Sequence, residues 1–185
     1  MSTAACFKQV SPTTLEFLIK NPEFIDSFLG DDFTEPSVNI SGEDKKKEWL
    51  EITARGKNVE GTDTDYAWHG ILYILEKLSK GEKPPITLAV RGPEENSVSG
   101  PGITFSYWNP GDVKSLTRSL NNISEKGFLA QYDGKDMNEK EIYLGNWEEH
   151  DGLIFKPYLW ENFLEMRNYY KDAANRNYGM IMYLS

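Results

Sequence analysis

The chain has 185 residues, of which 39% are hydrophobic and 13% aromatic, a composition typical of a globular protein. A chain of this length suits a single domain over residues 1–185 and buries roughly 70% of its unfolded surface, so its core needs neither disulfides nor a metal. Its net charge of −9 disfavours binding to nucleic acid and to anionic membranes, because both require a basic face.

The sequence also indicates in which cellular compartment the protein is expected. It has no run of about 20 apolar residues that could span a membrane, and its N-terminus lacks the basic and apolar segments of a secretory signal. The single cysteine, Cys6, cannot form a disulfide within the chain, which fits a reducing compartment. We therefore expect a cytoplasmic protein in which Cys6 is a small buried side chain of a strand and not a reactive thiol.

The first thirty residues predict a strand and two helices. Residues 3–10 form the strand. Ser11 and Pro12 begin a helix, because a serine caps the first N–H groups and a proline at the first position loses no hydrogen bond. Asn21 and Pro22 repeat this start for a second helix.

The next segments are polar. Gly30 is expected to end the second helix in the left-handed conformation, and a polar connection leads to a helix over residues 43–53. The basic run 45–47 lies between acidic residues, so we interpret it as a solvated helix end and not as a phosphate site.

Residues 65–80 carry the strongest helical pattern in the chain, and Gly81 is expected to end it. Its apolar residues fall within about 120° of one another at helical pitch, which predicts a face buried in the core. They are Trp68, Ile71, Leu72, Leu75 and Leu78. We interpret Trp68 as a core anchor and not as a platform for ligand stacking.

The following residues alternate between apolar and loop-like segments. Residues 84–90 predict a strand or a buried helical turn, and 103–108 alternate as a strand. Between them, 91–102 is rich in glycine, proline and serine, which predicts a long loop of functional or mobile character. An Asn-Pro pair opens a helix over 109–123.

The last third predicts helical turns at 136–141, a long helix over 158–175 and a closing strand over 178–185. Trp147 is expected in the core. With strands at both termini, the fold class is α+β, a single compact domain in which a small mixed or antiparallel sheet packs against four or five helices.

Asp65, His69 and Tyr73 raise the question of catalysis. Spaced four apart, they share one helix face, roughly 120° from the apolar stripe. A carboxylate beside an imidazole can tune a general base. Such spacing is also common on solvated faces, so we favour a water-facing row over a ligand contact, and a ligand contact over acid–base catalysis. Tyr107 and Tyr143 complete the candidate pocket.

Motifs for other chemistry are absent from the sequence. With two histidines and one cysteine, a zinc site is nearly excluded, and His150 lies in "NWEEHDG", which we interpret as a solvated acidic turn. GxSxG, SxxK, CxxC and HExxH are all missing. We expect no cofactor and no metal.

Five segments in order resemble the YfbM-like family, bacterial proteins classed as a domain of unknown function. They are "SPTTLEFL" (11–18), "DYAWHGILYIL" (65–75), "YWNPGDVKSLTRSL" (107–120), "YDGKDMNEKEIYLGNW" (132–147) and "AANRNYGMIMYL" (173–184). The resemblance spans nearly the whole chain and implies a compact α+β domain, but no activity.

Three positions depart from the family pattern. Tyr66 stands where a basic residue is common, Leu72 where a second histidine is expected, and Leu144 where a proline usually follows Glu-Ile-Tyr. If the second histidine serves chemistry elsewhere in the family, its absence here argues against an enzyme.

These observations leave three hypotheses. The first is a non-catalytic domain that binds another, basic protein through an acidic surface with aromatic anchors, compatible with a homodimer. The second is a small-molecule-binding protein or enzyme with its site near Asp65, His69 and Tyr73, under the loop 91–102. The third is a scaffold whose function depends on a partner that the sequence does not identify.

Overall fold

Five strands form one antiparallel sheet in a computed structural model that describes residues 4–30, 43–55, 60–79 and 86–185. The side chains of residues 43, 53–55, 150 and 151 are not described, so the interpretation of His150 lies outside the described part. In sheet order the strands are β2 (Thr62–Asp63), β1 (Ala5–Val10), β5 (Gly179–Leu184), β4 (Thr104–Trp108) and β3 (Ser97–Ser99).

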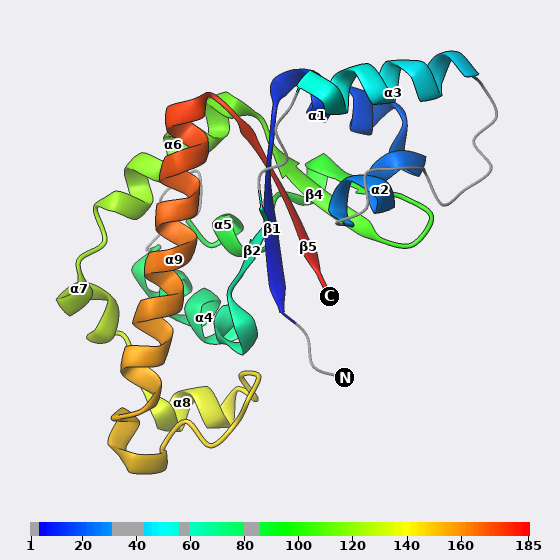
Figure 1. Cartoon of the computed structure of the whole chain (residues 1–185). Helices are drawn as coiled ribbons and strands as arrows, with labels where there is room; N and C mark the ends of the chain where they lie inside the picture. Colours follow the sequence, from blue (N-terminus) through cyan, green and yellow to red (C-terminus); the bar gives the residue numbers. More distant parts are fainter. Residues whose placement is uncertain (1–3, 31–42, 56–59, 80–85) are drawn as a thin grey trace.

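The central pair of strands joins the two ends of the chain. β1 and β5 pair over six residues each, with Phe7 opposite Met182 and Lys8 opposite Ile181 (Figure 1). Because successive side chains of a strand point to opposite faces, this register sends Phe7 and Met182 to one face and Ile181 to the other. The sheet therefore separates two hydrophobic clusters.

The larger cluster lies beneath six helices (Figure 1). Trp68, Ile71, Leu75 and Trp147 are all buried within it. The helices are α4 (Trp68–Leu78), α5 (Leu88–Arg91), α6 (Pro110–Asn121), α7 (Glu125–Leu129), α8 (Gly134–Glu139) and α9 (Phe155–Arg176).

The smaller cluster lies on the opposite face, beneath α1 (Pro12–Lys20), α2 (Ile25–Leu29) and α3 (Glu43–Arg55). Trp49 of α3 stacks on Phe17 of α1, with ring centroids 5.7 Å apart, and on Phe24 at 5.3 Å. This aromatic contact attaches α3 to the rest of the fold.

The expected α+β class is confirmed. α1 begins as its sequence predicts, because the Ser11 hydroxyl accepts a hydrogen bond from the Thr14 N–H at 3.1 Å. α6 also begins at its proline, although the Asn109 side chain makes no capping hydrogen bond. None of the helices in the described part of the chain combines the length and apolarity needed to cross a bilayer.

Several local expectations were wrong. Gly30 is extended, with φ of −70° and ψ of 156°, and is not left-handed. Residues 91–102 are not an irregular loop, since they contain a 3₁₀ turn and β3, which pairs with β4. Cys6 is half-buried, with its sulfur 3.3 Å from the Ser185 hydroxyl. The predicted helix end at Gly81 lies outside the described residues.

Candidate functional site

Asp65 does not lie on the α4 face that the sequence predicts. It belongs to a separate 3₁₀ turn and has a positive φ of 46°. Its N–H donates to the Asp63 carboxylate at 2.7 Å, and its own carboxylate accepts from the Tyr158 hydroxyl of α9 at 3.0 Å. Asp65 therefore fastens the start of α4 to α9 and does not orient His69.

His69 is half-buried and makes contacts within the fold. Its Nδ1 accepts the backbone N–H of Tyr143 at 3.0 Å, and its ring stacks on Trp68 with centroids 4.7 Å apart. Burial first, and the positive charge of Arg91 second, lower the pKa of the imidazole, while Glu76 opposes this shift. A neutral ring that accepts a backbone hydrogen bond stabilises the 141–148 segment and is a poor general base.

Tyr73 is buried, with an exposed fraction of 3%, so the expectation that this row faces water was wrong at its third member. Its hydroxyl donates to Asp136 of α8 at 2.6 Å, and Lys140 and Lys77 contact the same carboxylate oxygen at 2.9 and 3.2 Å. The Tyr73 hydroxyl first, and then these two ammonium groups, hold the pKa of the Asp136 carboxyl well below its usual range. Burial and Asp136 raise the pKa of Tyr73.

The two remaining candidates, Tyr143 and Tyr107, lie on different faces of the sheet. Tyr143 lies beside the row, with its ring 6.1 Å from that of Tyr66 and 6.4 Å from that of Trp68. Tyr107 packs against the smaller cluster, on the opposite face of the sheet. The five predicted residues therefore do not share one pocket.

The 91–102 segment is not a lid over His69. Arg91 reaches the row, with its guanidinium 5.5 Å from the Trp68 ring. The other end of the segment packs near α2, where a Cβ at Gly100 would lie 2.4 Å from Ile25.

The segment that does cover α4 is 132–148. Trp147 anchors it, since its backbone N–H donates to Asn138 Oδ1 at 2.9 Å and its indole N–H to the Ile142 carbonyl at 3.0 Å. Three non-glycine residues of this segment have positive φ, namely Glu141 at 51°, Leu144 at 92° and Asn146 at 59°. Such backbone costs energy, so the anchored tryptophan holds the segment in a strained shape.

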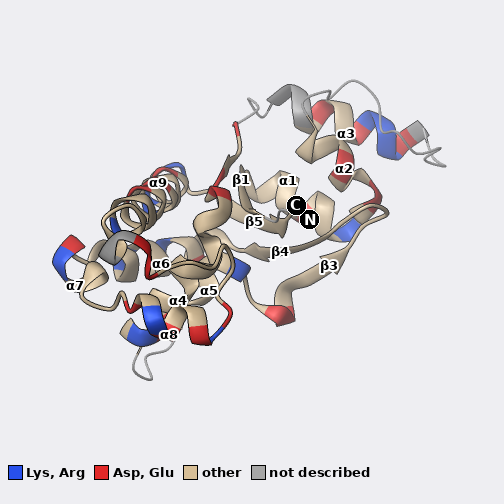
Figure 2. Cartoon of the chain, turned by 90° about the horizontal axis from the view of Figure 1, so that it is seen from below, with Lys and Arg blue, Asp and Glu red and all other residues tan. Residues whose placement is uncertain are grey.

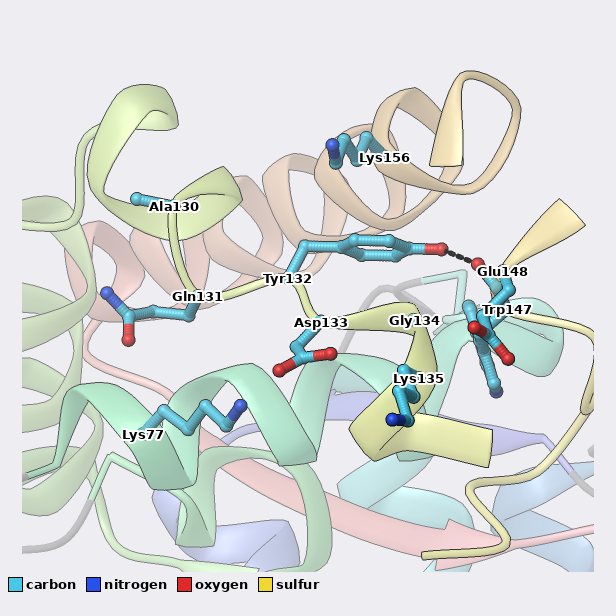
Figure 3. A pocket seen from close by; sticks show the side chains of 10 residues that line it. All are labelled: Lys77, Ala130, Gln131, Tyr132, Asp133, Gly134, Lys135, Trp147, Glu148 and Lys156. Atoms are coloured by element: carbon cyan, nitrogen blue, oxygen red, sulfur yellow. Dashed lines mark hydrogen bonds between the residues drawn. The ribbon is translucent and has the colours of Figure 1, made fainter. Parts of the chain in front are cut away.

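An open pocket of about 510 Å³ lies between this segment, the end of α4 and the start of α9 (Figure 3). Lys77, one helical step beyond Tyr73, forms one wall. Tyr132 crosses the pocket and donates its hydroxyl hydrogen to the Trp147 carbonyl, while Lys156 lies 5.1 Å from the Tyr132 ring. The lining residues are Lys77, Ala130, Gln131, Tyr132, Asp133, Gly134, Lys135, Trp147, Glu148 and Lys156.

Tyr132, which crosses the pocket, is not poised for proton transfer. Burial raises the pKa of Tyr132 to about 12, so its hydroxyl stays protonated at neutral pH. α8 carries both acidic and basic residues (Figure 2), and three lysines of this region, Lys77, Lys135 and Lys140, have acidic partners. In the part of the chain that the structure describes, no three His, Cys, Asp or Glu side chains gather in a way that could hold a metal ion.

Sequence reasoning missed this pocket, and a single signal could have indicated it. A Cβ at Gly134 would lie 2.5 Å from the Trp147 carbonyl oxygen, so the two backbones approach closely at the pocket wall. The glycine of "YDGKD" marks that approach in the sequence. The other walls come from segments far apart in the chain, which no local pattern connects.

A second feature is an exposed surface beside the row, which we call the Tyr66 surface. Tyr66 and Leu144 are 38% and 41% exposed, and Leu153 and Ile154 are 76% and 60% exposed. Tyr143 links Tyr66 to Leu144 through its ring contact and the chain itself. The surface consists of Asp65, Tyr66, Tyr143, Leu144, Leu153, Ile154 and Tyr158.

α9 connects the two halves of this surface. The Tyr158 N–H donates to the Ile154 carbonyl at 3.3 Å, and the Tyr158 hydroxyl reaches Asp65, the neighbour of Tyr66. Figure 1 shows the 134–154 segment at the lower end of α9, beside α4. The segment that carries these apolar residues thus lies at one end of the molecule.

The fold and the family resemblance agree with known proteins. No curated protein matches the chain. Its fold is similar to the crystal structure of YfbM, a protein of unknown function from Escherichia coli, with a TM-score of 0.65 and 14% identity over 98% of this chain and 99% of that one. At this identity the likeness shows the fold alone. Residues 1–183 match the family described as domain of unknown function DUF1877, so the chain belongs to this family.

Proposed function

We propose that the chain is a non-catalytic binding module that recognises a basic segment of another protein through the Tyr66 surface. The observation that carries this proposal is the exposure of the apolar side chains of Tyr66, Leu144 and Ile154. The expected partner carries lysine or arginine residues around an apolar anchor.

The apolar part of the surface supports the proposal. Tyrosine is enriched at the centre of protein interfaces, because its ring buries a large area while its hydroxyl stays hydrogen-bonded. Tyr66 and Tyr143 meet edge to face, with an angle of 67° between their rings. Leu153 and Ile154 add the most exposed aliphatic side chains of this end of the molecule.

The charge of the surface indicates the sign of the partner. Along α9, Glu161 and Glu165 follow Tyr158, and the Thr62 hydroxyl beside Asp63 donates to Glu165 at 3.2 Å. Within the described ranges, neither glutamate forms an ion pair with a lysine or arginine. Carboxylates without a cationic partner in the described part of the fold favour a basic segment and speed its association.

The backbone of Leu144 gives further support. At φ of 92° a leucine is strained, yet its side chain is exposed and stabilises nothing in the core. Strained residues of this kind cluster at ligand clamps and switch regions, where the surrounding structure holds them in place. The rival site at Asp65, His69 and Tyr73 has less support, because the three side chains bind three different internal partners.

The experiment is capture from native lysate at low and moderate salt, followed by measurement of the affinity of the isolated complex. Tyr66→Ser removes an anchor and Glu161→Lys reverses a charge. We expect losses of about tenfold or more for either change, since interface hot spots and charge reversals cost over 1 kcal/mol.

Matched controls lie on other parts of the surface. Leu50→Ser changes another exposed apolar residue, on α3, and Glu95→Lys reverses a charge in the 3₁₀ turn before β3. Both are expected to retain the partner. Capture of no stoichiometric protein, or equal loss in the control variants, would contradict the proposal.

A further inference from the structure

We propose that a second, separate groove binds a free amphipathic carboxylate of medium chain length, with Arg91 as its anchor. The groove has a volume of about 530 Å³ and lies where β4, β5 and α5 meet. We call it the Arg91 groove. The lining residues that carry the argument are Val90, Arg91, Thr104, Ser106, Met182 and Leu184.

The floor of the groove is the end of one sheet face. Thr104 and Ser106 of β4, and Met182 and Leu184 of β5, all point to the side of the larger cluster, because alternate residues share a face. Met182 is 2% exposed, whereas Leu184 is 46% exposed. Among the described residues, the cover of this face therefore stops between these two positions, and the Leu184 side chain leaves apolar surface at the groove.

Arg91 is held at the edge of this floor. The next residue, Gly92, has φ of 73°, and a Cβ there would lie 2.4 Å from the Ser106 Cβ and 2.8 Å from Met182. Only glycine allows α5 to end so close to the sheet. The guanidinium lies over the Trp68 ring, 5.5 Å from its centroid, a cation–π contact that restrains the charged group at the edge of the groove.

The charge of Arg91 has no acidic partner in the part of the chain that is described. A guanidinium pairs best with a planar carboxylate, through two parallel hydrogen bonds. The hydroxyls of Thr104 and Ser106 offer further donors, and the exposed Leu184 side chain, with Val90 and Met182 at the floor, offers contact for an alkyl chain. The volume lies within the range of small-ligand pockets.

Decanoate, used below its micellar concentration, is the probe, and decanol is its neutral counterpart. We expect decanoate to shift the amide NMR signals of residues 90–92, 103–106 and 182–184. Arg91→Gln is expected to lower the affinity for decanoate at least about tenfold and to leave the affinity for decanol unchanged. The reason is that only the charge-assisted hydrogen bonds to the carboxylate are lost. Arg118→Gln, on the exposed face of α6, is the matched control and is expected to bind decanoate normally.

A second variant covers the case in which Arg91→Gln does not fold. Leu184→Asp places a carboxylate in the groove at an exposed position, so it is expected to abolish decanoate binding while the far-ultraviolet spectrum stays unchanged. Absence of decanoate binding at millimolar concentration, signal shifts confined to other residues, or equal affinity in the wild type and both groove variants would overturn the proposal. Leu184 is not part of the Tyr66 surface, so failure of the decanoate experiment leaves the proposed function standing.

Discussion

Tyr73 and Asp136 connect α4 to α8 through one short hydrogen bond. Removing the hydroxyl with Tyr73→Phe is expected to raise the pKa of the Asp136 carboxyl toward its ordinary value, since that hydroxyl is the first cause of its lowering. A carboxyl whose folded-state pKa is lowered contributes stability above the unfolded value and loses it as the pH falls through the folded pKa. Tyr73→Phe is therefore expected to lose part of the stability that Asp136 contributes above its unfolded-state pKa.

Carbon-13 NMR titration of the Asp136 carboxyl measures the effect. Tyr107→Phe is the matched control, because within the described part of the chain its hydroxyl makes no hydrogen bond and it lies on the opposite face of the sheet. An unchanged Asp136 titration in Tyr73→Phe would show that the hydroxyl does not hold the carboxylate.

His69 gives a second prediction at this scale. Its folded-state pKa lies below its unfolded value near 6.5, so the unfolded chain takes up the proton first as the pH falls. Its contribution to stability is complete above that value and is lost as the pH falls through the folded pKa. In Arg91→Gln the pKa of His69 is expected to rise, because a repelling charge is removed, and proton NMR titration measures this. A titration identical to that of the wild type would contradict the role of Arg91.

At the scale of residues, the sequence predicted that His69 and Tyr73 lie one helical step apart, but neither the 3₁₀ turn that holds Asp65 nor the environment of these side chains. The spacing of Asp65, His69 and Tyr73 is real, yet helical periodicity describes one element alone. Whether a face meets water depends on what packs over it, and residues 132–148 cover this one from a distance of some seventy positions along the chain. No local pattern contains that contact.

α4 packs closely at Gly70, which leads to a prediction about helix packing. A Cβ there would lie 2.7 Å from Leu159 of α9 and 3.0 Å from Trp147. Gly70→Ala is expected to destabilise the protein by about 1–3 kcal/mol, although alanine is the better helix former. Gly111→Ala in α6, where a Cβ meets nothing within 4 Å, is expected to be neutral or stabilising. Denaturant unfolding compares the two, and equal effects would contradict the packing account.

The strained segment 141–146 leads to a prediction about stability and binding. Leu144→Gly is expected to raise the free energy of unfolding by about 1 kcal/mol, because glycine adopts positive φ without strain. The same change is expected to weaken binding of the captured partner, since it removes an exposed side chain of the Tyr66 surface. Chemical unfolding and affinity measurements separate the two effects. Lower stability would count against the strain argument. Stronger binding would count against the role of Leu144 in the Tyr66 surface.

Elements were predictable from sequence in proportion to their length. α1, α6 and α9 carry a proline at the start or several turns of apolar periodicity, so their signals are strong. β2 and β3 have two and three residues, too few to show alternation, and their pairing is set by neighbours distant in the chain. The "SVS" of β3 is also polar, so it resembled a loop until β4 paired with it.

On the scale of the molecule, the sheet divides the chain into two hydrophobic clusters and leaves two separate surfaces. Strands at both termini predicted the α+β class, and the β1–β5 pairing explains why those strands lie at the centre. The Tyr66 surface lies beside α4 and α9, and the Arg91 groove lies at the end of the sheet. With a net charge of −9, association with a basic partner is expected to slow as salt rises.

Hydrogen–deuterium exchange on the captured complex tests recognition through the Tyr66 surface most directly. We expect slower exchange of backbone amides in residues 65–67, 141–145 and 153–162 when the partner is bound, with no such change in Glu161→Lys. Protection confined to other segments, or protection that persists in Glu161→Lys, would contradict the account.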